Sequence, residues 1–234
     1  GTKNKSVLGG NVTYSTSLAA MRAACQTLHL SQYRYLNGGE IKTIPLPTSD
    51  MFAGGSYEDD TMPVQETTVV PYKASSISEA VEILCKIYKK LPDVIRKFQG
   101  GRRPEIGAMS EYMAPTSDFT DCLDILYETA YQCRCEDKIA FHIDCAFSEI
   151  YEPRRDTYNY CGKELCLNEI IDILKRATEK YDFLYIEDPV DENDWEGWAK
   201  AAKELSRTTL CGDDLTVTNI DSVSYTHLTL PTIA

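Results

Sequence analysis

The spacing of apolar residues along the chain predicts helices that alternate with short strands. In residues 76–91 the apolar positions recur every three or four residues, which is typical of an amphipathic helix. Ser76 followed by Glu79 has the pattern of a capping box, so we expect this helix to begin there. Further segments with helical spacing are residues 17–30, 118–133, 168–180 (with Asn168 as its expected N-cap) and 194–205.

Short apolar and β-branched runs between these helices predict the strands. They are residues 43–47, 66–71, 138–144, 183–188 and 208–213, and residues 156–160 have the character of a hairpin. Strands that alternate with helices over this length favour a parallel sheet with crossover helices, either closed into a barrel or open.

Three of the predicted strands end in acidic residues. Asp144 ends the first, Glu187 and Asp188 the second, and Asp213 and Asp214 the third. The carboxyl ends of parallel strands lie on one face of the sheet, so we expect these side chains to converge. Converging carboxylates repel one another, and oxygen ligands suit a hard cation such as Mg²⁺. The sequence therefore predicts a magnesium site, although any one acid could instead be a turn or helix-cap residue.

Asp188 is one of the acids for which such a structural role is the better explanation. Asp191 and Asp194 are interpreted in the same way, as turn and cap residues. Trp195 and Trp198 are better explained by helix packing than by substrate stacking.

Composition and charge narrow the class of protein. The 234 residues suffice for one large domain, or one domain and part of another, and the net charge of −12 argues against non-specific nucleic-acid binding. No apolar run approaches the ~20 residues of a membrane span, and the N-terminus has no signal-peptide core. Nine cysteines without zinc-site spacing indicate reduced thiols, so we expect a cytoplasmic protein. The chain starts without Met, and we expect it to begin inside a longer gene.

Five stretches of the sequence resemble enolases, and one of them, 8-LGGNVTYSTSLAAMRAA-24, resembles the end of the enolase N-terminal domain. The stretch 183-FLYIEDPVDENDWEGW-198 resembles the enolase block S-I-E-D-P-F-D-x-D-D-W, and 212-GDDLTVTN-219 resembles G-D-D-L-x-V-T-N. Likewise 142-HIDCAFSEIY-151 is similar to M-D-x-A-x-S-E-F-Y. A looser match covers residues 45–71, with a Gln-Glu pair at Gln65 and Glu66. Together the resemblance covers roughly residues 7–220.

The resemblance implies an α/β fold of enolase type. This is a (β/α)₈ TIM-like barrel, incomplete at the C-terminus and preceded by the end of an α+β N-terminal domain. We assign residues 1–40 to the end of that N-terminal domain and residues 41–220 to the partial barrel. Residues 221–234 resemble a translated sequencing-adaptor tail, and we expect them to be non-native.

The same resemblance implies a reaction and the residues that perform it. Enolases dehydrate 2-phosphoglycerate reversibly to phosphoenolpyruvate in glycolysis, with Mg²⁺ stabilising an ene-diolate. Carried over by position, Asp144, Glu187 and Asp213 would bind Mg²⁺. Glu66 and Glu111 would be catalytic, and Gln65 and Tyr57 would bind the phosphorylated small-molecule substrate. Family membership further implies a homodimer for the full-length protein.

Two departures from the family pattern leave alternatives open. Tyr57 stands where the family has His, and 107-GAMSEYMAP-115 stands where it has G-D-E-G-G-F-A-P. Glu111 is off register there, so it is either a displaced acid or a surface-loop residue. The strands that should carry the Lys base and the phosphate-binding Arg-Ser pair are missing, so we expect this chain alone to be inactive. The alternatives are an impaired homologue that binds a metal or a partner, or a lyase acting on a different hydroxy acid.

Overall fold

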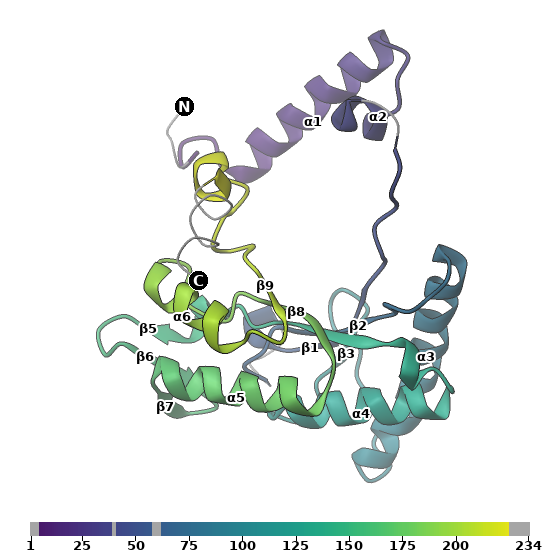
Figure 1. The fold of residues 1–234 in the computed structure, drawn as a ribbon, viewed down its shortest axis with the longest axis vertical. Helices are drawn as coiled ribbons and strands as arrows, with labels where there is room; N and C mark the ends of the chain where they lie inside the picture. The colour runs from purple at the N-terminus through teal and green to yellow at the C-terminus, as the bar shows by residue number, and fades with distance from the viewer. Residues whose placement is uncertain (1–4, 39–40, 58–61, 225–234) are drawn as a thin grey trace. The chain divides into compact units, whose positions relative to one another are not determined.

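The computed structural model describes residues 5–38, 41–57 and 62–224 (Figure 1). The chain divides into two compact units, Gly1–Pro45 and Leu46–Ala234. The first unit contains helices α1 (Gly10–Thr27) and α2 (Gln32–Asn37). Helix α1 begins seven residues before the predicted start at residue 17, and Cys25 is its only buried residue.

The second unit is built on a mixed six-stranded sheet. Its strands, in spatial order, are β3 (Tyr112–Met113), β1 (Ser49–Ala53), β2 (Glu66–Val70), β4 (Ala140–Asp144), β8 (Phe183–Glu187) and β9 (Thr209–Cys211). Six strands in the described part of the chain agree with an incomplete eight-stranded barrel. The predicted strand at 43–47 is wrong, because the first strand of the sheet begins at Ser49.

The direction of β2 differs from the prediction of a parallel sheet. Strands β4, β8 and β9 run parallel to one another, but β2 is antiparallel to both of its neighbours, β1 and β4. As a result the first residue of β2 lies beside the last residue of β4, and Glu66 pairs with Asp144. Asp144 in turn pairs with Glu187. The reversal therefore brings a residue that begins a strand to the edge where the other strands end.

The two faces of the sheet have different chemistry. Because side chains alternate along a strand, Val69, Phe141, Ile143 and Ile186 share one face, and all are buried in the core. The opposite face carries a row of polar side chains from β2, β4 and β8. They are Glu66, Thr68, His142, Asp144, Tyr185 and Glu187. The candidate chemistry of the chain is thus gathered on one face.

Four helices accompany the sheet: α3 (Ile77–Phe98), α4 (Phe119–Gln132), α5 (Leu167–Lys180) and α6 (Trp195–Glu204). Helices α4 and α5 lie next to each other along one side of it (Figure 1), joined by an ion pair between Lys180 and Asp124. Helix α3 continues seven residues beyond the predicted end at residue 91, through Pro92, because Val94 and Ile95 extend its buried stripe.

Side-chain caps begin three of the helices in the second unit. The Ser76 hydroxyl accepts from the Glu79 amide, Asp118 from the Thr120 amide, and Asp194 from the Gly197 amide. The exception is α5, whose N-cap is Cys166 rather than Asn168. The Asn168 side chain instead accepts a hydrogen bond from Lys200, so it ties α5 to α6.

Smaller elements complete the second unit. The expected hairpin is a three-stranded antiparallel sheet of β5 (Tyr151–Glu152), β6 (Thr157–Tyr160) and β7 (Lys163–Leu165). Short 3₁₀ helices span Gly55–Tyr57, Glu136–Lys138 and Phe147–Ile150. Residues 220–224 are helical, which the sequence pattern did not predict, and residues 225–234 of the predicted tail lie outside the described residues. None of the helices described is long and apolar enough to cross a membrane.

Candidate functional site

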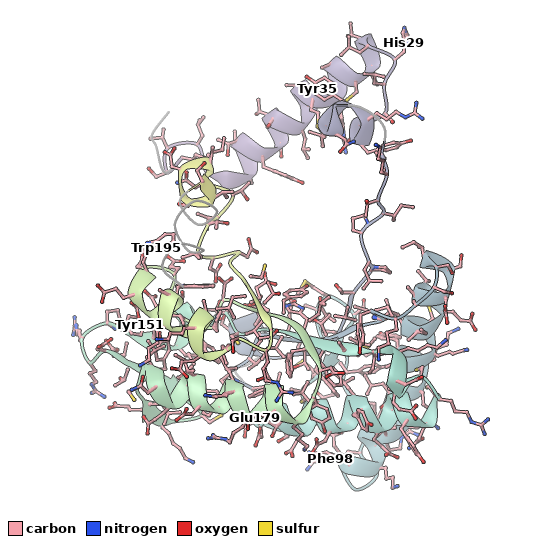
Figure 2. The ribbon with its side chains drawn as sticks, viewed as in Figure 1. His29, Tyr35, Phe98, Tyr151, Glu179 and Trp195 are labelled. Carbon is pink, nitrogen blue, oxygen red and sulfur yellow. The ribbon has the colours of Figure 1, made fainter. Side chains whose placement is uncertain are left out.

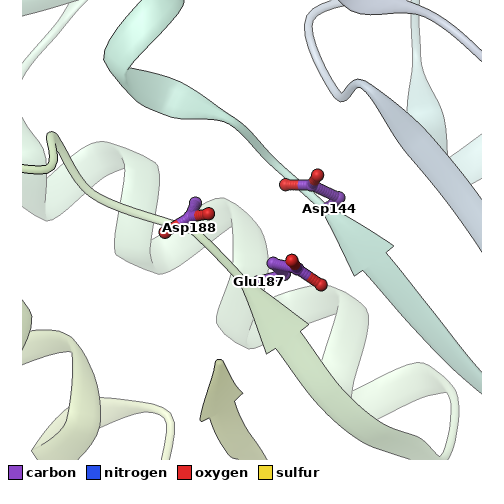
Figure 3. A group of neighbouring side chains, drawn as sticks. All are labelled: Asp144, Glu187 and Asp188. Atoms are coloured by element: carbon purple, nitrogen blue, oxygen red, sulfur yellow. The ribbon is translucent and has the colours of Figure 1, made fainter. Parts of the chain in front are cut away.

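Three carboxylates converge at the ends of β4 and β8 (Figure 3). Asp144, Glu187 and Asp188 each offer an oxygen, and these atoms all lie within 4.8 Å of one another. Asp144 and Glu187 are partly buried, and Asp188 is 1% exposed. Two of the three residues predicted as metal ligands, Asp144 and Glu187, are therefore together. The third, Asp213, has an exposed side chain and is not in this group.

Asp188 performs the turn role that the sequence suggested. Its carboxylate accepts hydrogen bonds from the backbone amides of Asp213 (3.1 Å), Asp214 (2.9 Å) and Leu215 (3.4 Å). It lies in the left-handed region, with a φ of 40°. The segment after β9 is thereby tied to the end of β8, which brings the backbone of Asp213 to the site.

Asp144 is held by polar contacts on both of its oxygens. Oδ1 accepts from the Ala146 amide at 3.0 Å, and Oδ2 lies 3.4 Å from Nε2 of Gln65. The backbone N–H of Gln65 also donates to the backbone carbonyl of Asp144 at 2.9 Å. Gln65, predicted from the Gln-Glu pair to bind substrate, thus lies directly beside a candidate ligand.

The electrostatics of this group favour a bound cation. Burial, followed by the charges of Glu187, Asp188 and Glu66, raises the pKa of Asp144 to about 8. Burial, followed by the charges of Asp50 and Glu187, raises the pKa of Glu66 to about 7. Carboxylates that raise one another's pKa in this way are stabilised in their charged form by a divalent cation. An all-oxygen donor set of partly buried carboxylates fits Mg²⁺.

Glu111 is buried, so its interpretation as a surface-loop residue is wrong. Glu111 is 5% exposed, and its Oε1 has no hydrogen-bond partner among the described residues. The next residue, Tyr112, pairs with Phe52 in the parallel β1–β3 ladder, which draws this segment onto the sheet. The charge of Glu111 is the smallest of those that raise the pKa of Glu66, the other predicted catalytic acid.

Tyr57 ends the short helix Gly55–Tyr57 directly after β1, and its side chain lies outside the described part of the structure. The described residues next to Tyr57 are hydrogen-bonded at this end of the sheet. The Gly55 amide donates to the Met62 carbonyl at 2.6 Å, and the Ser56 hydroxyl donates to Glu149 at 2.6 Å. Glu149 follows β4, so the loop is joined to the strand that carries Asp144.

Two aromatic residues next to this site were missed by the sequence analysis. His142 is 4% exposed, and its Nε2 lies 3.1 Å from Oε2 of Glu187. Its ring stacks on Tyr185, with centroids 3.9 Å apart and planes 20° from parallel. Counting back two residues from Asp144 and Glu187 places both on the acidic face, so alternation along the strands would have identified them.

Comparison with known proteins agrees with this geometry. Residues 41–227 match the family described as the enolase C-terminal TIM barrel domain. The chain is 36% identical over 222 residues to an enolase of Methanocaldococcus jannaschii, 34% over 220 residues to one of Methanococcus aeolicus, and 32% over 221 residues to one of Sulfolobus acidocaldarius. Each alignment covers 94% of this chain but only 52%, 52% and 53% of the respective relative. The chain thus spans about half the length of the curated relatives it matches.

An α/β sheet of barrel type, with acids converging at its strand ends, defines the class as an incomplete TIM-barrel domain. The chain belongs to the enolase family. The fold class expected from the sequence is therefore confirmed.

Proposed function

We propose that this chain carries the magnesium site and the acid of an enolase-type lyase, which dehydrates 2-phosphoglycerate reversibly to phosphoenolpyruvate in glycolysis. The observation that carries the proposal is the convergence of Asp144 and Glu187, with Glu66 paired opposite Asp144. Family membership supports the phosphorylated substrate, and it supports a cytoplasmic homodimer as the setting.

Asp144, Glu187 and Asp213 are the proposed Mg²⁺ ligands. Asp188 lies in the carboxylate group, but its oxygens already accept three backbone hydrogen bonds. Asp213 has an exposed carboxylate on a backbone that Asp188 holds at the site, so we keep it as the third ligand. When bound, Mg²⁺ would supply charge stabilisation where negative charge develops on the substrate.

Glu66 is the proposed acid for the leaving hydroxyl. A pKa raised to about 7 by burial and by neighbouring carboxylates leaves a proton on this side chain over part of the neutral range. A general acid works best when its pKa lies near the working pH. We propose that Glu111, which is also buried, is the second catalytic acid, and that Gln65 and Tyr57 contact the substrate.

A second candidate function is metal binding without turnover, or turnover of a different hydroxy acid. The off-register position of Glu111 and the presence of Tyr57 favour it, because both change the acid and loop chemistry around the substrate. The metal ligands would be unaffected by these changes, so metal binding and turnover are separable.

The test measures phosphoenolpyruvate formation from 2-phosphoglycerate by a coupled assay on the full-length protein, with and without Mg²⁺, and metal binding by calorimetry on the same samples. We expect Mg²⁺-dependent turnover that Glu187→Gln abolishes. The matched control is Glu179→Gln, an exposed residue of α5 labelled in Figure 2. Metal binding without turnover would favour the second candidate, and a folded chain that binds no Mg²⁺ would refute both.

A further inference from the structure

His142 lies beneath the carboxylate group, in the middle of β4. It is two residues before Asp144 and on the same face of the sheet, opposite Thr68 of β2 and Tyr185 of β8. The residue is 4% exposed, so its ring is almost completely removed from solvent. A buried imidazole needs partners for its nitrogens, because leaving a buried polar atom unpaired destabilises the folded state.

Among the described residues, neither Nδ1 nor Nε2 of His142 has a hydrogen bond of good geometry. The close acceptor is Oε2 of Glu187, 3.1 Å from Nε2. The same Glu187 side chain belongs to the carboxylate group with Asp144 and Asp188. His142 is therefore a buried ring whose Nε2 lies within hydrogen-bonding distance of a candidate ligand.

Tyr185 limits the orientations open to the ring. The two rings are stacked with centroids 3.9 Å apart and planes 20° from parallel. Tyr185 is two residues before Glu187 on the same strand and face, so one strand carries both the stacking partner and the acceptor. A ring held flat by a neighbour can present Nε2 in only a narrow range of directions.

We propose that His142 is a positioning residue, whose Nε2–H fixes the Glu187 carboxylate in the orientation that binds a divalent cation together with Asp144. This inference rests on the proposed metal site. Ligands that are free to rotate lose affinity, and residues that orient a ligand typically contribute a 10- to 100-fold effect on metal binding. Tyr185 supports the same function through His142 rather than by touching the metal.

The experiment compares two substitutions at His142 by titrating the whole chain with Mn²⁺ in a calorimeter. His142→Phe keeps the ring that stacks on Tyr185 but removes the donor. His142→Gln places an amide N–H near the position of Nε2. We expect the Phe variant to bind Mn²⁺ roughly 10- to 100-fold more weakly than the unmodified chain, and the Gln variant to recover most of that loss.

Equal Mn²⁺ affinity in the unmodified chain and the folded Phe variant would overturn the inference while leaving the metal site intact. A Gln variant that binds as weakly as the Phe variant would also overturn it, because ring shape and not the donor would then matter. Absence of Mn²⁺ binding in the unmodified chain would instead refute the proposed function. If the Phe variant does not fold, the same titration compares two substitutions at Tyr185. Tyr185→Leu removes the ring that stacks on His142 and is expected to bind Mn²⁺ more weakly than Tyr185→Phe, which keeps a ring. Equal affinities of these two variants would overturn the inference.

Discussion

Replacing Asp188 by alanine should destabilise the second unit strongly. The Asp188 carboxylate, 1% exposed, accepts from three consecutive backbone amides at 3.1, 2.9 and 3.4 Å. Alanine would leave these amides without that acceptor and would free the segment after β9 from the end of β8. The perturbation therefore tests whether one buried side chain joins these two strand ends.

The magnitude follows from the hydrogen bonds. A hydrogen bond to a charged group contributes ~1.5–3 kcal/mol, and the contact at 3.4 Å is too long to count fully. Two good bonds therefore give about 3–6 kcal/mol. Burial raises the pKa of Asp188 to about 6, which shows that its charged form is costly in this environment. Removing that charge offsets part of the loss, so we expect a net destabilisation of about 3 kcal/mol.

Urea denaturation at neutral pH measures this effect. With a slope of ~2 kcal/mol per molar, the midpoint should fall by about 1.5 M in Asp188→Ala, and by less in Asp188→Asn, which keeps one oxygen. The control is Asp118→Ala, which removes an ordinary N-cap of α4 and should cost about 1 kcal/mol. If Asp188→Ala loses no more than this control, the hydrogen bonds to the segment after β9 do not stabilise the fold, and the reasoning is wrong.

Three further predictions concern pH, the core and a tight loop. The pKa of Asp144 is raised to about 8 from an ordinary value of 3.8. Between these two values the metal-free folded state holds a proton on Asp144 that the unfolded state has lost. The urea midpoint should therefore fall as the pH rises from about 4 to 8. Saturating Mg²⁺ should flatten this profile, and a midpoint that rises over the same range would contradict the assignment. Leu123→Ala, at a fully buried position of α4, should cost about 2–5 kcal/mol in urea denaturation, against a much smaller loss for Leu184→Ala, which is 42% exposed. Gly54→Ala places a Cβ 2.4 Å from a backbone carbonyl oxygen of the loop before β2. We therefore expect a destabilisation of about 1–3 kcal/mol in urea denaturation. An unchanged urea midpoint would show that the loop can move.

The sequence by itself determined the elements whose signals are local. Helix α3 was predicted from its apolar spacing and its Ser76 cap, and the strand that ends in Glu187 from four apolar residues followed by acids. Such signals are readable because periodicity and capping involve residues only a few positions apart. The acids at the ends of these strands were expected to converge, and the register of β4 and β8 does place Asp144 opposite Glu187. The end of α3 was misjudged at Pro92, because packing of later residues overrode the local breaker.

Tertiary structure alone decided which distant residues meet. The reversed direction of β2 places Glu66 beside Asp144, the short strand β3 buries Glu111, and strand pairing brings His142 under Glu187. The periodicity within one segment cannot predict which residues become neighbours, since strand direction and register depend on pairing between segments far apart in the chain. The sequence thus determined which side chains were available for chemistry, and the arrangement of the sheet decided which of them share one site, because only pairing fixes the distances between carboxylates.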